Sequence, residues 1–276
     1  MPERLTPGAA DDVARAAALP FRIVEAFGVG CGYERSVKLR PGRLSVNRYL
    51  LGIQAADVQA TQWLEACRRL NMPEALIDEF RAGLLEANVV LIGFEDDGPG
   101  SCIYKLYLEY WDRLRDKLRA GQPPAEPHLL HKGFKWYIDE PSRCVVTRYE
   151  CLAGLDAGGI RDRIEQIYQD APDPGCRDAA LGILEISRRH APRRQFLYLD
   201  VSERGNPRRS FDLNLYPAGL HVGRFAEQIR NAAVSLDAPL RDLDRLLAMV
   251  SDRPFGHISG GLSRDGEEYF TFYHER

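Results

Sequence analysis

The chain has 276 residues, of which 45% are hydrophobic, and a formal net charge of −3 at pH 7. A chain of this length and composition can bury a large core, as one big domain or as two smaller ones. The charge excludes a bulk electrostatic attraction to nucleic acid, so any anion site must be a local cluster of Lys and Arg.

In chain order, the sequence predicts a helical arm over residues 1–28 and then five strand pairs, each with its own turn signal. The predicted pairs are Tyr33–Leu39 with Leu44–Leu51, Asn88–Glu95 with Cys102–Tyr110, Leu129–Tyr137 with Arg143–Cys151, Gln195–Ser202 with Arg209–Tyr216, and Gly256–Ser263 with Glu268–His274. Between the pairs, apolar residues recur at three- and four-residue steps, as in helices that pack on a sheet. These helices are predicted at Val58–Leu70, Pro73–Ala87, Trp111–Ala120, Ile160–Tyr168, Arg177–His190, Val222–Val234 and Pro239–Val250.

Polar and apolar residues alternate along the predicted strands. Tyr269, Thr271 and Tyr273 share one face of the last strand, and Phe270 and Phe272 share the other. An apolar face suits covering helices, and a polar face suits a lined chamber. We therefore expect an α+β fold with a closed antiparallel ten-stranded β-barrel of repeated ββαα units surrounded by helices, which spans residues 1–276 as a single domain. A two-domain α+β protein with split sheets is the alternative.

The six cysteines include no Cys-x-x-Cys pair and no zinc-like spacing with histidine. We expect them to be reduced, mostly packed thiols. No apolar run approaches the roughly 20 residues of a membrane span, and nothing resembles a signal peptide. These features predict a soluble, cytoplasmic protein without nucleic-acid or membrane partners.

A polar residue, a spacer and a tyrosine recur on the second strand of four predicted hairpins. The four copies are Lys105-Leu106-Tyr107, Thr147-Arg148-Tyr149, Asn214-Leu215-Tyr216 and Thr271-Phe272-Tyr273. Each tyrosine shares a face with its polar partner, and their regular recurrence indicates a repeated supersecondary unit. A ring of tyrosines interleaved with hydrogen-bond donors and cations suits a polyanion beside a developing carbocation.

A barrel of repeated ββαα units with such strands resembles the ABBA prenyltransferases, and most closely the cyanobactin-type peptide prenyltransferases. The sharpest local match is the first hairpin, where Glu34 and Arg48 occupy the spacing of a glutamate and an arginine in that family. The likeness covers roughly residues 31–275. It implies transfer of an isoprenyl group from dimethylallyl or geranyl diphosphate to a side chain of a ribosomal, cyclic peptide, with Arg, His, Tyr or Trp as acceptor. It also implies that Mg²⁺ helps to bind the diphosphate.

Alkyl transfer from an allylic diphosphate needs cations that hold the diphosphate. Arg48 and Lys105 are the predicted ligands, because both are cations on inward strand positions, where charge-assisted bonds to phosphate oxygens are strong. Lys132 and Asn214 are further candidates. The alternative for Arg48 is an ion pair with Glu34, since the turn at residues 41–42 places the two nearly opposite.

The reaction also needs a carboxylate and a shield against water. Glu34 is expected to be the general base or to orient the acceptor, and a salt bridge is its alternative role. Four tyrosines are expected to shield the carbocation, although tyrosine also favours strands for ordinary reasons. These are Tyr107, Tyr149, Tyr216 and Tyr273.

Four residues are expected on the acceptor side of the chamber. Asp200 and Asp212 would complement a basic acceptor such as a guanidinium or an imidazole, Tyr198 would share a face with Asp200, and Trp136 would stack on a peptide. Alternatively, the aspartates pair with Arg194, Arg208 or Arg209, and Trp136 is packing.

Other signals carry no predicted role. His257 precedes Ser259-Gly260-Gly261, but no G-x-S-x-G pattern accompanies it. Glu95-Asp96-Asp97 is expected to be solvated at a hairpin tip. Two further hypotheses remain beside the peptide prenyltransferase: a non-catalytic barrel that binds a peptide or small ligand, and a prenyltransferase of aromatic small molecules on the same barrel.

Overall fold

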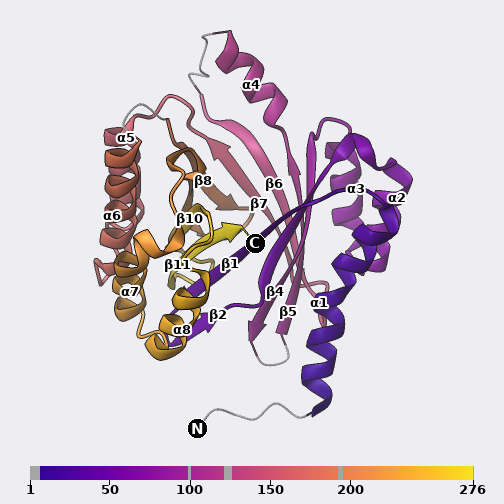
Figure 1. Cartoon of the computed structure of the whole chain (residues 1–276). Helices are drawn as coiled ribbons and strands as arrows, with labels where there is room; N and C mark the ends of the chain where they lie inside the picture. Colours follow the sequence, from indigo (N-terminus) through magenta and orange to yellow (C-terminus); the bar gives the residue numbers. More distant parts are fainter. Residues whose placement is uncertain (1–6, 99–100, 121–125, 192–194, 276) are drawn as a thin grey trace. The chain divides into compact units, whose positions relative to one another are not determined.

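The computed structural model describes residues 7–98, 101–120, 126–191 and 195–275 (Figure 1). The α-helices are α1 (Pro7–Phe27), α2 (Ala60–Arg69), α3 (Glu74–Leu84), α4 (Trp111–Arg119), α5 (Ala157–Ile167), α6 (Gly175–His190), α7 (Ala226–Ser235) and α8 (Leu240–Val250). The strands are β1 (Gly32–Arg40), β2 (Arg43–Ser45), β3 (Arg48–Gln54), β4 (Val89–Gly98), β5 (Ser101–Glu109), β6 (His128–Tyr137), β7 (Cys144–Cys151), β8 (Leu197–Glu203), β9 (Arg209–Asn214), β10 (Phe255–Leu262) and β11 (Glu268–Glu275). Short 3₁₀ helices are η1 (Ala55–Asp57), η2 (Tyr216–Ala218) and η3 (Val222–Phe225).

All five predicted strand pairs are confirmed, with two differences in detail. The second strand of the first pair is divided into β2 and β3, which gives eleven strands instead of ten. The fourth pair ends at Asn214, so Tyr216 begins the 3₁₀ helix η2 instead of completing β9. The predicted helical arm is one helix, α1, which continues through Pro20, and residues 1–6 of the predicted arm lie outside the described residues.

The hydrogen-bonded strand order confirms the predicted closed barrel. The strands follow one another as β11-β10-β9-β8-β7-β6-β5-β4-β3-β1-β2, and β11 also pairs with β1. A sheet that returns to its first strand in this way leaves few free edges for pairing with another chain. Among the described residues, no helix has both the length and the apolar character that a membrane crossing requires.

Contacts within the chain define two compact units, and each combines several segments. Unit 1 consists of Met1–Tyr33, Asn47–Arg115 and Leu130–Thr147, and unit 2 consists of Glu34–Val46, Asp116–Leu129 and Arg148–Arg276.

In unit 1, one face of β3–β6 packs against α1, α2 and α3. Buried apolar side chains occupy this face of each strand, and Leu51, Ile92 and Leu106 are cross-strand neighbours on it. Polar atoms on this face bond to the helices: the Tyr104 hydroxyl donates to the Ala16 carbonyl at 3.1 Å, and Trp136 Nε1 donates to the Leu70 carbonyl at 3.0 Å. The opposite face of these strands carries Arg48, Glu95 and Lys105.

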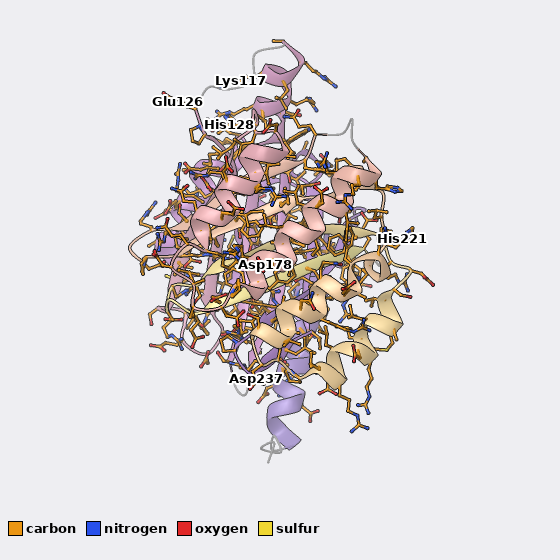
Figure 2. The ribbon with its side chains drawn as sticks, turned by 90° about the vertical axis from the view of Figure 1, so that its left-hand side faces the viewer. Lys117, Glu126, His128, Asp178, His221 and Asp237 are labelled. Carbon is orange, nitrogen blue, oxygen red and sulfur yellow. The ribbon has the colours of Figure 1, made fainter. Side chains whose placement is uncertain are left out.

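In unit 2, α5–α8 cover one face of β8–β11 (Figure 1). Phe211, Leu213, Ile258, Phe270 and Phe272 form the strand side of this core. In Figure 2 these helices face the viewer, and the exposed Asp178 of α6 lies on the side turned away from the strands. The other face of the strands is polar, since cross-strand neighbours there include Ser259, Thr271 and Asp212.

Candidate active site

A carboxylate and a histidine meet on the polar face of unit 2. Glu34 lies near the start of β1, and His257 lies on β10. His257 Nε2 is 3.0 Å from Glu34 Oε1, and the Tyr216 hydroxyl donates to the same oxygen at 2.7 Å. On its other side, His257 Nδ1 lies 2.9 Å from Asp212 Oδ1 and 3.0 Å from Oδ2. We call Glu34, His257, Asp212 and Tyr216 the carboxylate cluster.

Strand register explains why the carboxylate cluster forms. His257 is the cross-strand neighbour of Asn214, two residues from Asp212 on the same face of β9. Tyr273 of β11 stacks on the imidazole, with ring centroids 3.8 Å apart. Gly256 is required beside this cluster, because a Cβ there would lie 2.7 Å from the Tyr216 ring and hydroxyl.

The carboxylate cluster is mostly enclosed, which amplifies its electrostatics. The exposed fractions of the Glu34, His257 and Asp212 side chains are 18%, 18% and 8%. Burial by itself favours neutral His257, but Asp212 and Glu34 outweigh it and raise the His257 pKa well above its ordinary value. Burial likewise acts to raise the pKa of Glu34, yet the His257 charge and hydrogen bonds from His257 and Tyr216 hold that pKa below its ordinary value. Glu34 is therefore an ionised, weakly basic carboxylate.

Unit 1 carries a buried group of charges on its polar face. Arg48 Nε lies 3.1 Å from Glu95 Oε1, and Lys105 Nζ forms an ion pair with Glu95 Oε2. All three side chains are at least 90% buried. Two cations share the Glu95 carboxylate, and guanidinium and ammonium ions also form charge-assisted bonds to phosphate oxygens. Within unit 1, Arg48 therefore pairs with Glu95, and the alternative pairing with Glu34 of unit 2 stays a prediction.

Tyr107 follows Lys105 on the polar face of β5, as predicted. Its ring covers Gly133, where an added Cβ would lie 2.6 Å from the ring. Lys135 of β6 is opposite Lys105, and its Nζ lies 6.0 Å from the centre of the Tyr107 ring. The predicted combination of tyrosine and cation thus occurs here, with Lys135 as an additional member.

The prediction that Lys132 binds diphosphate is wrong. Lys132 is the cross-strand neighbour of Leu108, so both point to the helix-facing side of the sheet. There its Nζ forms a salt bridge of 2.7 Å with Glu79 of α3. Lys135 is three positions further along β6, an odd offset, so of these two lysines it is Lys135 that shares the face of Lys105.

A second group of cations lies on the polar face of unit 2. Arg208 Nη1 lies 2.6 Å from Glu203 Oε1, and Arg264 Nη2 lies 3.3 Å from the same oxygen. Arg208 also donates to the Tyr269 hydroxyl at 2.8 Å, and Lys38 Nζ lies 5.2 Å from the centre of that ring. The sequence did not predict this group, whose guanidinium and ammonium ions are suited to bind an anion.

The three remaining predicted tyrosines and Asn214 are distributed over unit 2. Tyr149 of β7 lies close enough to Arg208 to interact with it electrostatically, whereas Tyr216 and Tyr273 belong to the surroundings of Glu34. Asn214 Oδ1 accepts a hydrogen bond from the Tyr216 backbone at 3.2 Å. Asn214 therefore lies at the carboxylate cluster and holds the turn that presents Tyr216. Its role as a diphosphate ligand stays a prediction, as does the carbocation shield.

The prediction that Asp200 and Tyr198 line the acceptor side is wrong. Their cross-strand neighbours are Phe211 and Leu213, which belong to the core under the helices, and Tyr198 stacks on Phe211 with centroids 6.1 Å apart. Asp200 forms an ion pair with Arg163 of α5. Of the alternative partners considered for the aspartates, Arg194 lies outside the described residues. Asp212 is opposite Leu199 and faces the other way, so the two aspartates do not act together.

Two further expectations fail for related reasons. Trp136 is fully buried against the helices and bonds to Leu70, so it is packing and not a platform for a peptide. Glu95 is not solvated, because β4 continues to Gly98 and places Glu95 between Arg48 and Lys105. The available signal for this role of Glu95 was an arginine directly opposite it on β3 and a lysine diagonal to it on β5, since Lys105 is opposite Gly93.

His257 is the most important residue of the carboxylate cluster for which the sequence predicted no role. Its position in an alternating strand with Ser259 and Gly261 already assigned it to the polar face. The pairing with Glu34 is 223 residues distant in sequence, and only the closure of β11 on β1 brings the two strands near each other.

The residues present do not form a protein-held Mg²⁺ site. Within the described part of the chain, no three His, Cys, Asp or Glu side chains are grouped as metal ligands. The buried groups next to Glu95 and Glu203 are guanidinium and ammonium ions, which have no lone pair for a metal. The donor set therefore matches direct binding of an anion by cations, and Mg²⁺ bound through the oxygens of the diphosphate stays a prediction.

Neither a protein-family model nor a curated protein matches the chain. Solved structures do. A structure of 5-dimethylallyltryptophan synthase from Streptomyces coelicolor with DMASPP and Trp superposes with a TM-score of 0.60 at 15% identity, over 98% of this chain and 90% of that one. The PriB complex with product diphosphate has a TM-score of 0.58 at 18% identity, over 88% and 79%. The 6-dimethylallyltryptophan synthase from Micromonospora olivasterospora gives 0.53 at 15% identity, over 88% and 81%. At such identities the likeness establishes the fold, and these neighbours have the barrel fold of prenyltransferases.

Proposed function

We propose that this protein transfers a dimethylallyl group from its diphosphate to the aromatic ring of an acceptor, such as the indole of tryptophan or the phenol of tyrosine. The observation that supports this most directly is Glu34: an ionised carboxylate, mostly enclosed, with Tyr216, His257 and Tyr273 gathered around it. The fold is shared with proteins described as dimethylallyltryptophan synthases.

The donor step requires positive charge. The bond between C1 of the dimethylallyl group and its diphosphate oxygen breaks, and both electrons leave with the diphosphate. In unit 1, Arg48 and Lys105 are suited to stabilise this developing charge, because their guanidinium and ammonium groups form charge-assisted bonds to phosphate oxygens. In unit 2, Arg208 and Arg264 form a separate cationic group. The ring of Tyr107, which shares the strand face of Lys105, is suited to face the allyl cation and to exclude water from it.

The acceptor step requires only a weak base. The aromatic ring supplies an electron pair to C1, a new bond forms, and the ring becomes a cation. This cation is a strong acid, so Glu34 accepts its proton even with a lowered pKa, and the C–H electrons restore aromaticity. The products are the prenylated ring, diphosphate and one proton.

The same property disfavours an arginine acceptor. A guanidinium has a pKa above 12 and has to lose a proton before it can attack, which a weak carboxylate base does not promote. Asp200, which was expected to help bind such a cation, points towards α5 instead. The electrostatics of the carboxylate cluster therefore favour a neutral aromatic nucleophile over a guanidinium.

The proposal is tested by incubating the purified chain with dimethylallyl diphosphate and a panel of acceptors. The panel contains free tryptophan and tyrosine, cyclic peptides that carry each of these residues, and matched cyclic peptides with arginine or histidine. Mass spectrometry should detect one added dimethylallyl unit on the aromatic acceptors, with stoichiometric release of diphosphate. Transfer to cyclic peptides alone supports the cyanobactin-type expectation, and a preference for arginine contradicts the proposed acceptor class. No adduct with any acceptor, together with no binding of the donor, supports the non-catalytic barrel.

A further inference from the structure

His257 lies between two carboxylates, and both of its ring nitrogens are used. Nε2 is 3.0 and 3.2 Å from the two oxygens of Glu34, and Nδ1 is 2.9 and 3.0 Å from the two oxygens of Asp212. An ionised carboxylate only accepts hydrogen bonds, so a nitrogen that faces one has to carry a proton. A neutral imidazole has one N–H and satisfies one partner, whereas the imidazolium satisfies both.

The groups around His257 favour this charged form. Glu34 comes from β1, Asp212 from β9, Tyr216 from η2, and Tyr273, His274 and Glu275 from β11. Tyr216 is neutral, because burial and the charge of Glu34 raise its pKa above its ordinary value. Burial holds the pKa of His274 below its ordinary value, so it adds little positive charge. The nearest charges that face His257 are therefore those of the two carboxylates.

We infer that His257 is a positioning residue, an imidazolium at neutral pH that Asp212 holds in place and that fixes the orientation and limits the basicity of Glu34. This inference rests on the proposed function for its catalytic consequence, but the charge state of His257 is a property of the resting protein. The role is indirect: Glu34 receives the acceptor proton, and His257 acts through Glu34.

The arrangement also explains why Asp212 and Glu34 have different roles. Asp212 has the smaller exposed fraction, and its two oxygens both face Nδ1. Glu34 is more exposed, and it shares its oxygens between His257 and Tyr216. Asp212 is thus committed to His257, while Glu34 is the carboxylate available to an acceptor.

The charge state is tested first, without any assay of activity. The protein is labelled with ¹⁵N-histidine, and the imidazole ¹⁵N shifts are followed between pH 5 and 9. The signal of His257 is assigned by its absence from the His257→Gln protein. We expect a doubly protonated ring at neutral pH and a lower titration midpoint in Asp212→Asn. A neutral ring at pH 7 in the wild-type protein overturns the inference.

The consequence for catalysis is tested with the pH profile of kcat for the acceptor that the panel identifies. In His257→Gln, Glu34 loses its compensating charge, so its pKa rises and the acidic limb of the profile should move to higher pH. We also expect kcat to fall about tenfold or more, with an unchanged KM for the donor. The matched control is Asp200→Asn, an aspartate on the helix-facing side of β8, which should leave the profile unchanged.

The possible failures are distinguishable. If the wild-type protein transfers no prenyl group but His257 is doubly protonated, the proposed function is contradicted and the inferred charge state of His257 is supported. If the wild-type protein is active, and His257→Gln folds but the acidic limb of its pH profile is not shifted, the positioning role is contradicted and the proposed function is supported. Should His257→Gln fail to fold, the ¹⁵N shifts of the wild-type and Asp212→Asn proteins decide, with assignment by the remaining five histidine variants.

Discussion

At the scale of single residues, Lys105 and Lys132 show how the face of a strand decides what a lysine can bind. The two lysines lie on neighbouring strands, β5 and β6. Lys105 is buried beside Glu95 on the polar face, and Lys132 contacts Glu79 on the helix-facing side. The sequence places both lysines in predicted strands, and the cross-strand register decides which face of the sheet each one occupies.

We expect Lys105→Ala to weaken binding of dimethylallyl diphosphate or its thiolodiphosphate analogue by about tenfold or more, because a charge-assisted contact to the diphosphate is lost. Isothermal titration calorimetry measures this directly. Lys132→Ala is the matched control and should retain the affinity of the wild-type protein. Equal losses in both variants would show that the polar face of unit 1 does not bind the diphosphate.

Glu34→Gln separates the base from the donor site. The amide keeps the shape and can still contact Tyr216, but it cannot take up the acceptor proton, so kcat should fall about 100-fold or more. Donor affinity should change little, since Glu34 lies in unit 2 with His257 and Asp212 and not among the cations. The control is Glu185→Gln on the outer side of α6, which should behave as the wild-type protein. Wild-type rates in Glu34→Gln would remove Glu34 from the mechanism.

At the scale of elements, alternation predicted the strands and helices well. The five hairpins and the helices between them were predictable because period-two and period-3.6 patterns are local properties of the chain. Cross-strand register was not predictable, and it is the source of the errors at Lys132, Asp200 and Tyr198. A shift of one residue moves a side chain to the opposite face, and the sequence of a single strand does not say which polar residue faces the helices.

Trp136 tests whether β6 has been assigned the correct faces. The ring is fully buried and bonds to the end of α2, so Trp136→Ala should lower the free energy of unfolding by about 3–5 kcal/mol. Urea denaturation monitored by circular dichroism measures the loss. Trp136→Phe should be milder, since it removes mainly the hydrogen bond to Leu70. A raised KM for a peptide acceptor with unchanged stability would instead place Trp136 at the substrate.

At the scale of the whole molecule, the resemblance and the hairpin repeats together predicted the closed strand order that the structure confirms. The sites were less predictable, because Glu34 and His257 are joined only by this closure. A contact between residues 223 positions apart has no local sequence pattern, so the carboxylate cluster could be identified only from the three-dimensional structure.

The same cluster makes the stability of the molecule depend on pH. Because the pKa of His257 is raised in the folded state, its stabilising contribution to the free energy of unfolding is complete below about pH 6.5. This contribution is lost as pH rises through the pKa of His257 in the folded state. The lowered pKa of Glu34 means that its contribution is present above about pH 4.5 and is lost as pH falls through its folded-state pKa. The two contributions therefore coincide between about pH 4.5 and 6.5.

We expect the difference in unfolding free energy between the wild-type protein and His257→Gln to be largest in this window and to shrink towards alkaline pH. Urea denaturation of both proteins over a pH series measures it, and the other titrating groups cancel in the difference. A difference that is constant with pH would contradict the charged state of His257.

The central claim is that the polar face of the barrel strands binds an allylic diphosphate. A crystal structure of the protein with dimethylallyl thiolodiphosphate tests it most directly. The account predicts diphosphate oxygens in contact with the polar-face cations, Lys105 and Arg48 among them, and the allyl group against tyrosine rings. An analogue bound on the helix-facing side beside Lys132, or anywhere remote from these cations, would contradict it.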